Sequence, residues 1–220
     1  VVANRLSEAP ENRVLLLEAG GSDKKPSIRL PAAIMHAANS EQLNWHYPGA
    51  PDRSKLGQSY TWSGGRVLGG SSSINGMMFV RGHPKDFDLW AQKGCTGWDY
   101  ESVLPYFRKS ERFEGGRDEF RGADGPQWVS FQRHDNPTAD KFVEAAVASG
   151  IPFADDYNGA EMEGVSYVQV SQKNGQRFNT ARAYLDPVRN RKNLEIRTGC
   201  RVKKILFEGT RAIGVQYQVE

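Results

Sequence analysis

The first twenty residues change from a helical pattern of apolar positions to an unbroken apolar run. Residues 1–7 read as the second half of a helix, a turn containing Pro10 follows, and Val14–Leu17 shows no alternation with polar residues. A short, unbroken apolar run is typical of a parallel strand that is buried on both faces. The pattern therefore predicts a helix, a turn and a buried parallel strand that ends at Glu18.

Proline and aspartate residues mark the starts of later helices. Pro84 suits the first turn of a helix and Asp86 would lie near its positive end, so we expect a helix from residue 84. Asp99 is a suitable N-terminal cap for a second helix, which Pro105 should kink or interrupt. A third helix is expected over residues 137–149.

Short strand patterns dominate the second half of the chain, and a long polar loop precedes them. Residues 44–63 are rich in Pro, Gly and Ser yet carry aromatic residues, and long loops in compact chains usually have a function. The strand-like segments are 128–131, 165–171, 194–198, 202–207 and 212–219. The segments 128–131 and 165–171 flank the helix at 137–149 and predict a lobe of mixed helices and strands. The last three segments are predicted to be strands that belong to the first domain again.

Composition and charge narrow the class of protein. The 220 residues include 29 basic and 26 acidic side chains, and the net charge of +3 is too small and too scattered to indicate nucleic-acid binding. Cys95 and Cys200 form no CxxC motif, so we expect no metal site and favour a reducing, cytoplasmic compartment, with membrane association left open. No run approaches the roughly 20 apolar residues of a transmembrane helix, so no transmembrane segment is expected.

Glu18 is a candidate ligand for a nucleotide ribose. It ends the predicted strand and is followed by Ala19, Gly20 and Gly21, which is where dinucleotide-binding folds place an acidic residue. The glycine fingerprint of such folds lies roughly 20 residues earlier, so we expect the first strand and its phosphate-binding turn to precede Val1. Alternatively, Glu18 only caps a strand in a surface loop, and this stretch alone does not separate the two interpretations.

A second stretch, Ser63–Met78, contains five glycines and four serines. Gly69 and Gly70 can adopt positive φ and would let a ligand touch the main chain. We expect a helix to begin near Asn75, with its N–H groups facing a diphosphate or a redox ring that becomes anionic on reduction. The alternative is a glycine-rich turn without a ligand.

Residues Gly64–Asp88, GGRVLGGSSSINGMMFVRGHPKDFD, resemble the first signature of the glucose–methanol–choline (GMC) oxidoreductase family of flavoproteins. Three further stretches resemble the same family: NRLSEAPENRVLLLEAGG, NGQRFNTARAYLDPVRNRKNLEIRTG and VKKILFEGTRAIGVQY. Together they cover nearly the whole chain in the family's order and are most similar to its bacterial choline-dehydrogenase-like and alcohol-dehydrogenase-like branch.

The resemblance implies FAD as the cofactor. Glu18 matches the carboxylate that binds the adenosine ribose, and Val202 matches a residue whose main chain contacts the adenine while its side chain belongs to the core. Some members attach FAD covalently through a histidine at the position of Ile74, so non-covalent FAD is expected here. The residues expected to contact FAD are Glu18, Arg66, Val67, Gly69, Gly70, Ser71, Asn75, Gly76, Met77, Met78 and Val202.

The resemblance also implies a fold. We expect an α/β protein with a Rossmann-like, doubly wound and mainly parallel FAD-binding sheet, formed by residues 1–110 and 194–220. Residues 111–193 would begin a mixed α+β substrate lobe. The first strand and the C-terminal half of the family's fold are expected to lie outside this chain.

The implied activity is oxidation of an alcohol to an aldehyde or ketone, with hydride transfer to flavin N5 and electrons passing on to a quinone or oxygen. The family's catalytic histidine would lie beyond Glu220, so no catalytic residue is assigned, and His36, His46, His83 and His134 are interpreted as surface or loop residues. Two alternatives stay open: a lyase that keeps FAD as a structural relic, and a non-catalytic product on the same scaffold.

Overall fold

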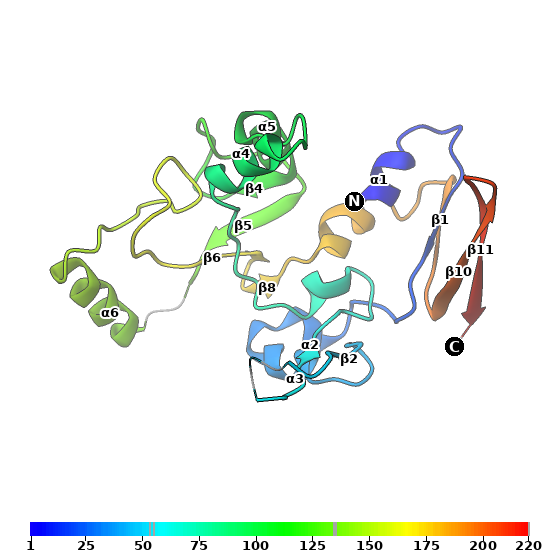
Figure 1. Cartoon of the computed structure of the whole chain (residues 1–220), viewed down its shortest axis with the longest axis horizontal. Coiled ribbons are helices and arrows are strands. Elements are labelled where there is room, and N and C mark those ends of the chain that lie inside the picture. The colour runs from blue at the N-terminus through cyan, green and yellow to red at the C-terminus, as the bar shows by residue number, and fades with distance from the viewer. Residues whose placement is uncertain (53, 55, 134–135, 220) are drawn as a thin grey trace. The chain divides into compact units, whose positions relative to one another are not determined.

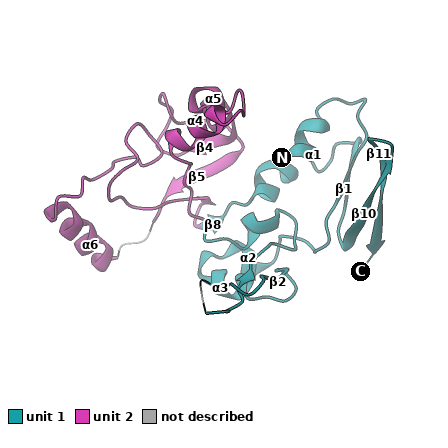
Figure 2. Cartoon of the chain, viewed as in Figure 1, with its two compact units in different colours: residues 1–76, 176–220 teal, residues 77–175 magenta. Residues whose placement is uncertain are grey.

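The computed structural model describes residues 1–52, 54, 56–133 and 136–219, so His134 lies outside the described residues. The chain forms two compact units, coloured separately in Figure 2. Unit 1 consists of Val1–Gly76 and Gln176–Glu220, and unit 2 consists of Met77–Gly175. The divisions therefore fall after residues 76 and 175, whereas the sequence suggested 110 and 193. The assignment of a cofactor role and a substrate role to the two parts stays a prediction.

Unit 1 is built on two parallel strands that the sequence predicted separately. Strand β1 (Val14–Leu17) pairs in parallel with β9 (Leu194–Arg197), so that Val14 lies opposite Leu194. Buried residues of helix α1 (Val2–Leu6) and of the π-helix η4 (Ala181–Leu185) pack with these strands in one hydrophobic cluster. The apolar run at the start of the sequence is thus a parallel strand, as predicted, but it is not buried on both faces, because Leu15 has an exposed fraction of 45%.

A long hairpin follows this pair (Figure 1). Strands β10 (Cys200–Glu208) and β11 (Arg211–Val219) are antiparallel, and most of their described side chains are exposed. The prediction that the Val202 side chain belongs to the core is therefore wrong, because its exposed fraction is 42%. The apolar pattern identified the strand correctly, but it did not reveal that this hairpin is covered by little of the described chain.

Short elements complete unit 1 and surround the glycine-rich stretch. Ile28, Ala37, Leu43, Val67 and Ile74 form a second buried cluster among them. The elements are α2 (Pro26–Arg29), η1 (Pro31–Ala33), α3 (Ile34–Ala38), β2 (Tyr47–Pro48), β3 (Thr61–Trp62), η3 (Gly70–Ser73), β8 (Gln176–Arg177) and η5 (Asp186–Val188).

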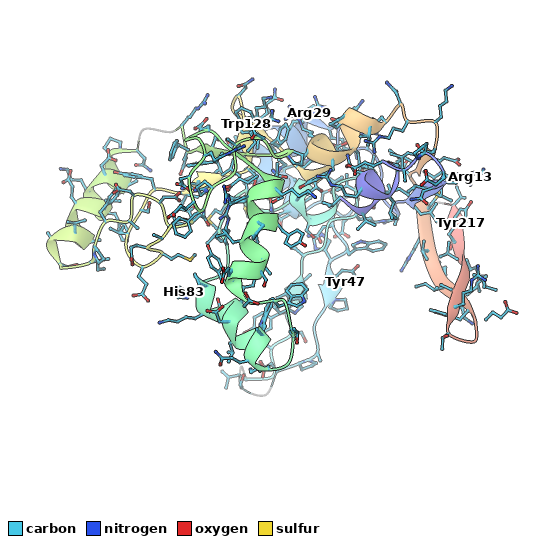
Figure 3. The ribbon with its side chains drawn as sticks, turned by 90° about the horizontal axis from the view of Figure 1, so that it is seen from above. Arg13, Arg29, Tyr47, His83, Trp128 and Tyr217 are labelled. Atoms are coloured by element: carbon cyan, nitrogen blue, oxygen red, sulfur yellow. The ribbon has the colours of Figure 1, made fainter. Side chains whose placement is uncertain are left out.

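Unit 2 contains the helices that the capping residues predicted. Helix α4 (Pro84–Gln92) begins at a capping box in which the side chain of His83, labelled in Figure 3, accepts a hydrogen bond from the Lys85 N–H. Helix α5 (Tyr100–Ser110) is capped by Asp99 and continues through Pro105, so the proline does not interrupt it. The proline ring costs the helix one backbone hydrogen bond without ending it.

The rest of unit 2 is a small mixed sheet and one further helix. Strand β4 (Glu111–Phe113) is parallel to β5 (Gln127–Phe131), and β5 is antiparallel to β6 (Gln169–Val170). The remaining elements are α6 (Pro137–Ala148) and β7 (Gln172–Lys173).

A buried ionic network lies beside this sheet. The Arg121 guanidinium, fully buried, donates to Glu111 at 2.8 Å and to both carboxylate oxygens of Asp156 at 2.6 and 2.7 Å. Arg81 donates to Glu111 at 2.6 Å. Each buried charge in this network thus has an opposite charge in contact with it, which is the condition under which buried ions are tolerated.

Among the described residues, no helix has the length and apolar character needed to cross a membrane.

Candidate cofactor-binding site

Glu18 is held rigidly at the end of β1. Its N–H donates to the Arg197 carbonyl, and its own carbonyl accepts from the Cys200 N–H, both at 2.9 Å. One carboxylate oxygen accepts from the Gly20 N–H at 2.8 Å. These bonds fix both the backbone and the side chain of Glu18, so the half-buried carboxylate is oriented without help from a ligand.

The Glu18 turn lies directly against the glycine-rich stretch. Gly21 forms a parallel bridge with Val67, and the Leu68 N–H donates to the Gly21 carbonyl at 3.0 Å. A Cβ atom on Gly20 would lie 1.7 Å from the Arg66 carbonyl oxygen, so only glycine permits this crossing. The two segments that the sequence singled out separately are therefore neighbours in the fold.

These segments open onto a cavity of about 390 Å³ in unit 1. Glu18, Gly65 and Val202 line it, and they come from three separate parts of the chain. The cavity thus brings together the predicted ribose ligand, the glycine-rich stretch and the predicted adenine contact.

Three aromatic or basic residues that the sequence did not assign also line this cavity: Trp45, Tyr47 and Arg201. The rings of Trp45 and Tyr47 are stacked, with their centroids 6.0 Å apart. Tyr47 is labelled in Figure 3. The guanidinium groups of Arg66 and Arg201 each lie 5.1 Å from the centre of the Trp45 ring, a cation–π distance. The aromatic content of loop 44–63 suggested a function, but sequence spacing gave no indication that this loop meets β10.

The backbone of the glycine-rich stretch forms a tight turn instead of the expected α-helix. Gly69 and Gly70 have φ of 88° and 55°, and residues Gly70–Ser73 form a single 3-10 turn. No α-helix begins near Asn75, so that prediction is wrong. The serine hydroxyls bond back to the turn, with Ser72 donating to the Gly69 carbonyl at 2.6 Å, which satisfies local backbone groups without a helix.

The reasons for glycine differ along this turn. A Cβ on Gly65 would lie 2.2 Å from the Gly70 backbone, and one on Gly69 would lie 2.6 Å from the Ser73 hydroxyl. A Cβ on Gly70 would meet nothing within 4 Å. The close neighbours of Gly65 and Gly69 are therefore parts of the chain itself, while the open side of the turn is at Gly70.

The segment after β8 supports the turn from inside unit 1. Asn179, which is buried, donates to the Ser73 hydroxyl at 2.8 Å and to Asp23 at 3.2 Å. The Thr180 N–H donates to the Ser72 hydroxyl at 3.0 Å. Two stretches that resembled the same family are thus one structural feature, in which residues near 179 hold the serines in place.

The other predicted contact residues have varied environments. Val67 has no exposed surface among the described residues, main chain included, and its carbonyl accepts a hydrogen bond from the Gly70 N–H at 2.8 Å. Ser71 accepts a hydrogen bond from the Gly65 N–H. A Cβ on Gly76 would approach only the Ile34 side chain, at 3.9 Å, so this glycine is not packed tightly. Asn75 accepts a hydrogen bond from Arg177 at 2.7 Å.

Met77 and Met78 belong to unit 2. Met77 is buried at a φ of 63°, and its carbonyl accepts from the Ser171 N–H at 2.8 Å. Met78 has an exposed fraction of 66%.

In the described part of the chain, no group of three or more His, Cys, Asp or Glu residues is placed to hold a metal ion.

The profile of the GMC oxidoreductase family matches residues 28–220. The chain belongs to the GMC oxidoreductase family. The resemblance to this family is thereby confirmed, and the profile covers the glycine-rich stretch and the two companion stretches that follow it. Mitochondrial choline dehydrogenase of Mus musculus is 42% identical over 224 residues, which cover 99% of this chain and 38% of that protein.

Solved structures of GMC-type proteins share the fold. Pyridoxine 4-oxidase from Mesorbium loti matches with a TM-score of 0.90 at 34% identity, over 98% of this chain and 44% of that chain. An FAD-dependent oxidoreductase from Chaetomium thermophilum matches with a TM-score of 0.89 at 31% identity, over 99% of this chain and 39% of that chain. These matches confirm the α/β fold class. The chain spans about two fifths of the length of the GMC relatives it matches.

Proposed function

We propose that this chain forms part of an FAD-dependent oxidoreductase that oxidises an alcohol to an aldehyde or ketone. The observation that carries the proposal is the convergence of Glu18, Gly65 and Val202 on one cavity. The family's FAD chemistry, and the FAD-dependent oxidoreductase among the structural matches, support the choice of cofactor.

The residues of the cavity suit the adenosine half of FAD. The Glu18 carboxylate already accepts one hydrogen bond and can accept more, because an ionised carboxylate offers about four acceptor sites. A ribose supplies hydroxyl donors that suit these sites. The Val202 main chain and the Trp45–Tyr47 pair line the same cavity and would accommodate the adenine.

Unit 1 also suits non-covalent binding of FAD. Ile74 stands where some relatives carry the histidine that links to the flavin, and it is 4% exposed within the cluster of Ile28, Leu43 and Val67. An isoleucine offers no nucleophile and is here directed into the core. The open side of the turn at Gly70 is the place where a bound ring or diphosphate could approach the main chain.

FAD, when bound, supplies a two-electron acceptor for the alcohol. The residues of this chain would bind and orient it: Glu18 would fix the ribose, and the turn around Gly70 would support the diphosphate and ring. The electron acceptor after FAD would be a quinone or oxygen. Similarity to choline dehydrogenase favours a dehydrogenase, while the match to pyridoxine 4-oxidase keeps an oxidase open. The predicted cytoplasmic location stays a prediction.

The test uses the full-length protein. Purified protein should carry the visible absorbance of oxidised flavin, and this absorbance should be lost under anaerobic conditions on adding a substrate alcohol from a panel that includes choline and pyridoxine. A flavin that no alcohol in a broad panel reduces would contradict the oxidase or dehydrogenase role and favour the lyase alternative. A protein purified without flavin would contradict the cofactor assignment itself.

A further inference from the structure

Arg177, at the end of β8 (Figure 1), is among the largest fully buried side chains of the described chain, with an exposed fraction of 1%. Its Nε donates to the Ile28 carbonyl at 2.9 Å. Its Nη1 donates to the Ser72 carbonyl at 3.1 Å and to Asn75 Oδ1 at 2.7 Å. Its Nη2 is buried and has no hydrogen-bond partner among the described residues.

The charge on Arg177 has no counter-ion in the described part of the chain. Every acceptor it uses is a neutral oxygen, and none of the ion pairs in the described residues includes it. Burial lowers the pKa of Arg177 to about 10, so the group remains charged at neutral pH. Arg121 differs, because Glu111 and Asp156 outweigh the effect of burial and raise its pKa.

A buried cation without a counter-ion is costly, and one further unpaired N–H adds to the cost. The positive potential of such a group acts on its surroundings more strongly than it would in water, because the local dielectric constant is low. The surroundings here are Ser72 and Asn75, two residues of the turn that begins at Gly69. The sequence had suggested a helix N-terminus as the source of positive potential at this turn; the structure has a buried guanidinium there instead.

We propose that Arg177 is the built-in cation of the Gly69–Asn75 turn and that, acting through Ser72 and Asn75, it raises the reduction potential of the cofactor bound against this turn. This inference rests on the proposed function. On oxidation the alcohol would give a hydride from its carbon to the flavin and its hydroxyl proton to a base or to solvent, so the reduced ring would carry one negative charge. A nearby fixed cation stabilises that charge and therefore favours reduction. Arg177 is a positioning residue in this account, because it is Asn75 and the turn that face the cofactor.

The experiment compares the reduction potential of bound FAD in full-length wild-type protein and in Arg177→Met, Arg177→Lys and Asn75→Asp. Arg177→Met removes the charge, and Asn75→Asp keeps the arginine but gives it a carboxylate partner. Both should lower the equilibrium constant for reduction at least tenfold, about 30 mV for a two-electron couple. Arg177→Lys retains the charge and should stay close to wild type.

Arg191→Met is the matched control. Arg191, in the same unit, also donates to neutral oxygens, those of Asn4 and Ser7, but not to the turn. Its loss should lower the melting temperature and leave the potential unchanged. If Arg177→Met fails to fold, Arg177→Gln takes its place, because it also removes the charge but keeps a hydrogen-bond donor for the neutral oxygens around it.

Two results would overturn the inference. The first is an unchanged potential in Asn75→Asp with a normal content of FAD. The second is a reduction potential of bound FAD that is as low in Arg177→Lys as in Arg177→Met. That result would show that the shape of the arginine side chain, and not its charge, sets the potential. Wild-type protein without FAD would contradict the proposed function and this inference together, whereas normal FAD content with unchanged potentials contradicts this inference alone.

Discussion

The glycines of the stretch Ser63–Met78 are needed for different physical reasons. Gly65 and Gly69 are needed because the chain packs against itself, at 2.2 and 2.6 Å from where a Cβ would lie. Gly70 is needed only for its φ of 55°, and the space beside it is open. Gly70 is therefore the position at which a substitution separates the needs of the fold from the needs of a ligand.

Gly70→Ala should weaken FAD binding by at least tenfold while costing about 1 kcal/mol of unfolding free energy for its left-handed backbone. Gly209→Ala is a matched control, since Gly209 has a φ of 58° and open space around it but lies in the β10–β11 turn. The two variants should lose similar stability, measured by denaturant unfolding of the apoprotein. Equal affinities for FAD in Gly70→Ala and Gly209→Ala would show that no ligand lies beside Gly70.

Ile74 gives a prediction about the link between protein and cofactor. Because this buried side chain stands at the position of the linking histidine, FAD should be released completely when the full-length protein is denatured. The measurement is the division of flavin absorbance between precipitated protein and supernatant. Flavin that stays with the precipitated protein would reveal a covalent link through another residue.

Secondary-structure elements were predictable where their signals are local. The unbroken apolar run of β1, the Asp99 cap of α5 and the Pro84 start of α4 each depend on a few adjacent residues, and the structure has all three elements. The turn at Gly69 was not predictable in the same way. Its conformation depends on positive φ values and on contacts with Asn179, more than one hundred positions away.

Asp156 gives a prediction at the level of the unit 2 sheet. Burial alone would raise the pKa of Asp156, but hydrogen bonds from Arg121 and Gln169 and the charge of Arg121 outweigh it and lower the pKa. A carboxyl group with a lowered pKa in the folded state stabilises the protein above its unfolded pKa, about 3.9 for aspartate. That stabilisation is lost as the pH falls through the lower, folded value.

Asp156→Asn should therefore be less stable than wild type at pH 7, and the difference should shrink below about pH 4. Denaturant unfolding of the full-length protein across this range measures it. Asp155→Asn, at the exposed neighbouring position, serves as the control and should change stability little at any pH. A difference between Asp156→Asn and wild type that stays constant with pH would contradict the ionic role of Asp156.

At the scale of the whole molecule, the family and fold followed from motifs, but the lining of the cavity did not. Glu18 and the glycine-rich stretch were identified because their residue types are unusual at those positions. Trp45 and Arg201 were not identified, because their meeting depends on how loop 44–63 and β10 are brought together. The exposure of the Val202 side chain could not be predicted for the same reason, because an apolar pattern identifies a strand but not the residues that pack against it.

The affinity of the full-length apoprotein for FAD, in wild type and in Glu18→Gln, tests the central claim most directly. Glutamine can still accept from the Gly20 N–H, so the turn should survive while the charge-assisted bond to the ribose is lost. A loss of about 1.5–3 kcal/mol corresponds to roughly 10- to 150-fold weaker binding. Glu195→Gln, on the exposed part of β9, should bind FAD as wild type does. Equal FAD affinity in Glu18→Gln and wild type would contradict the account.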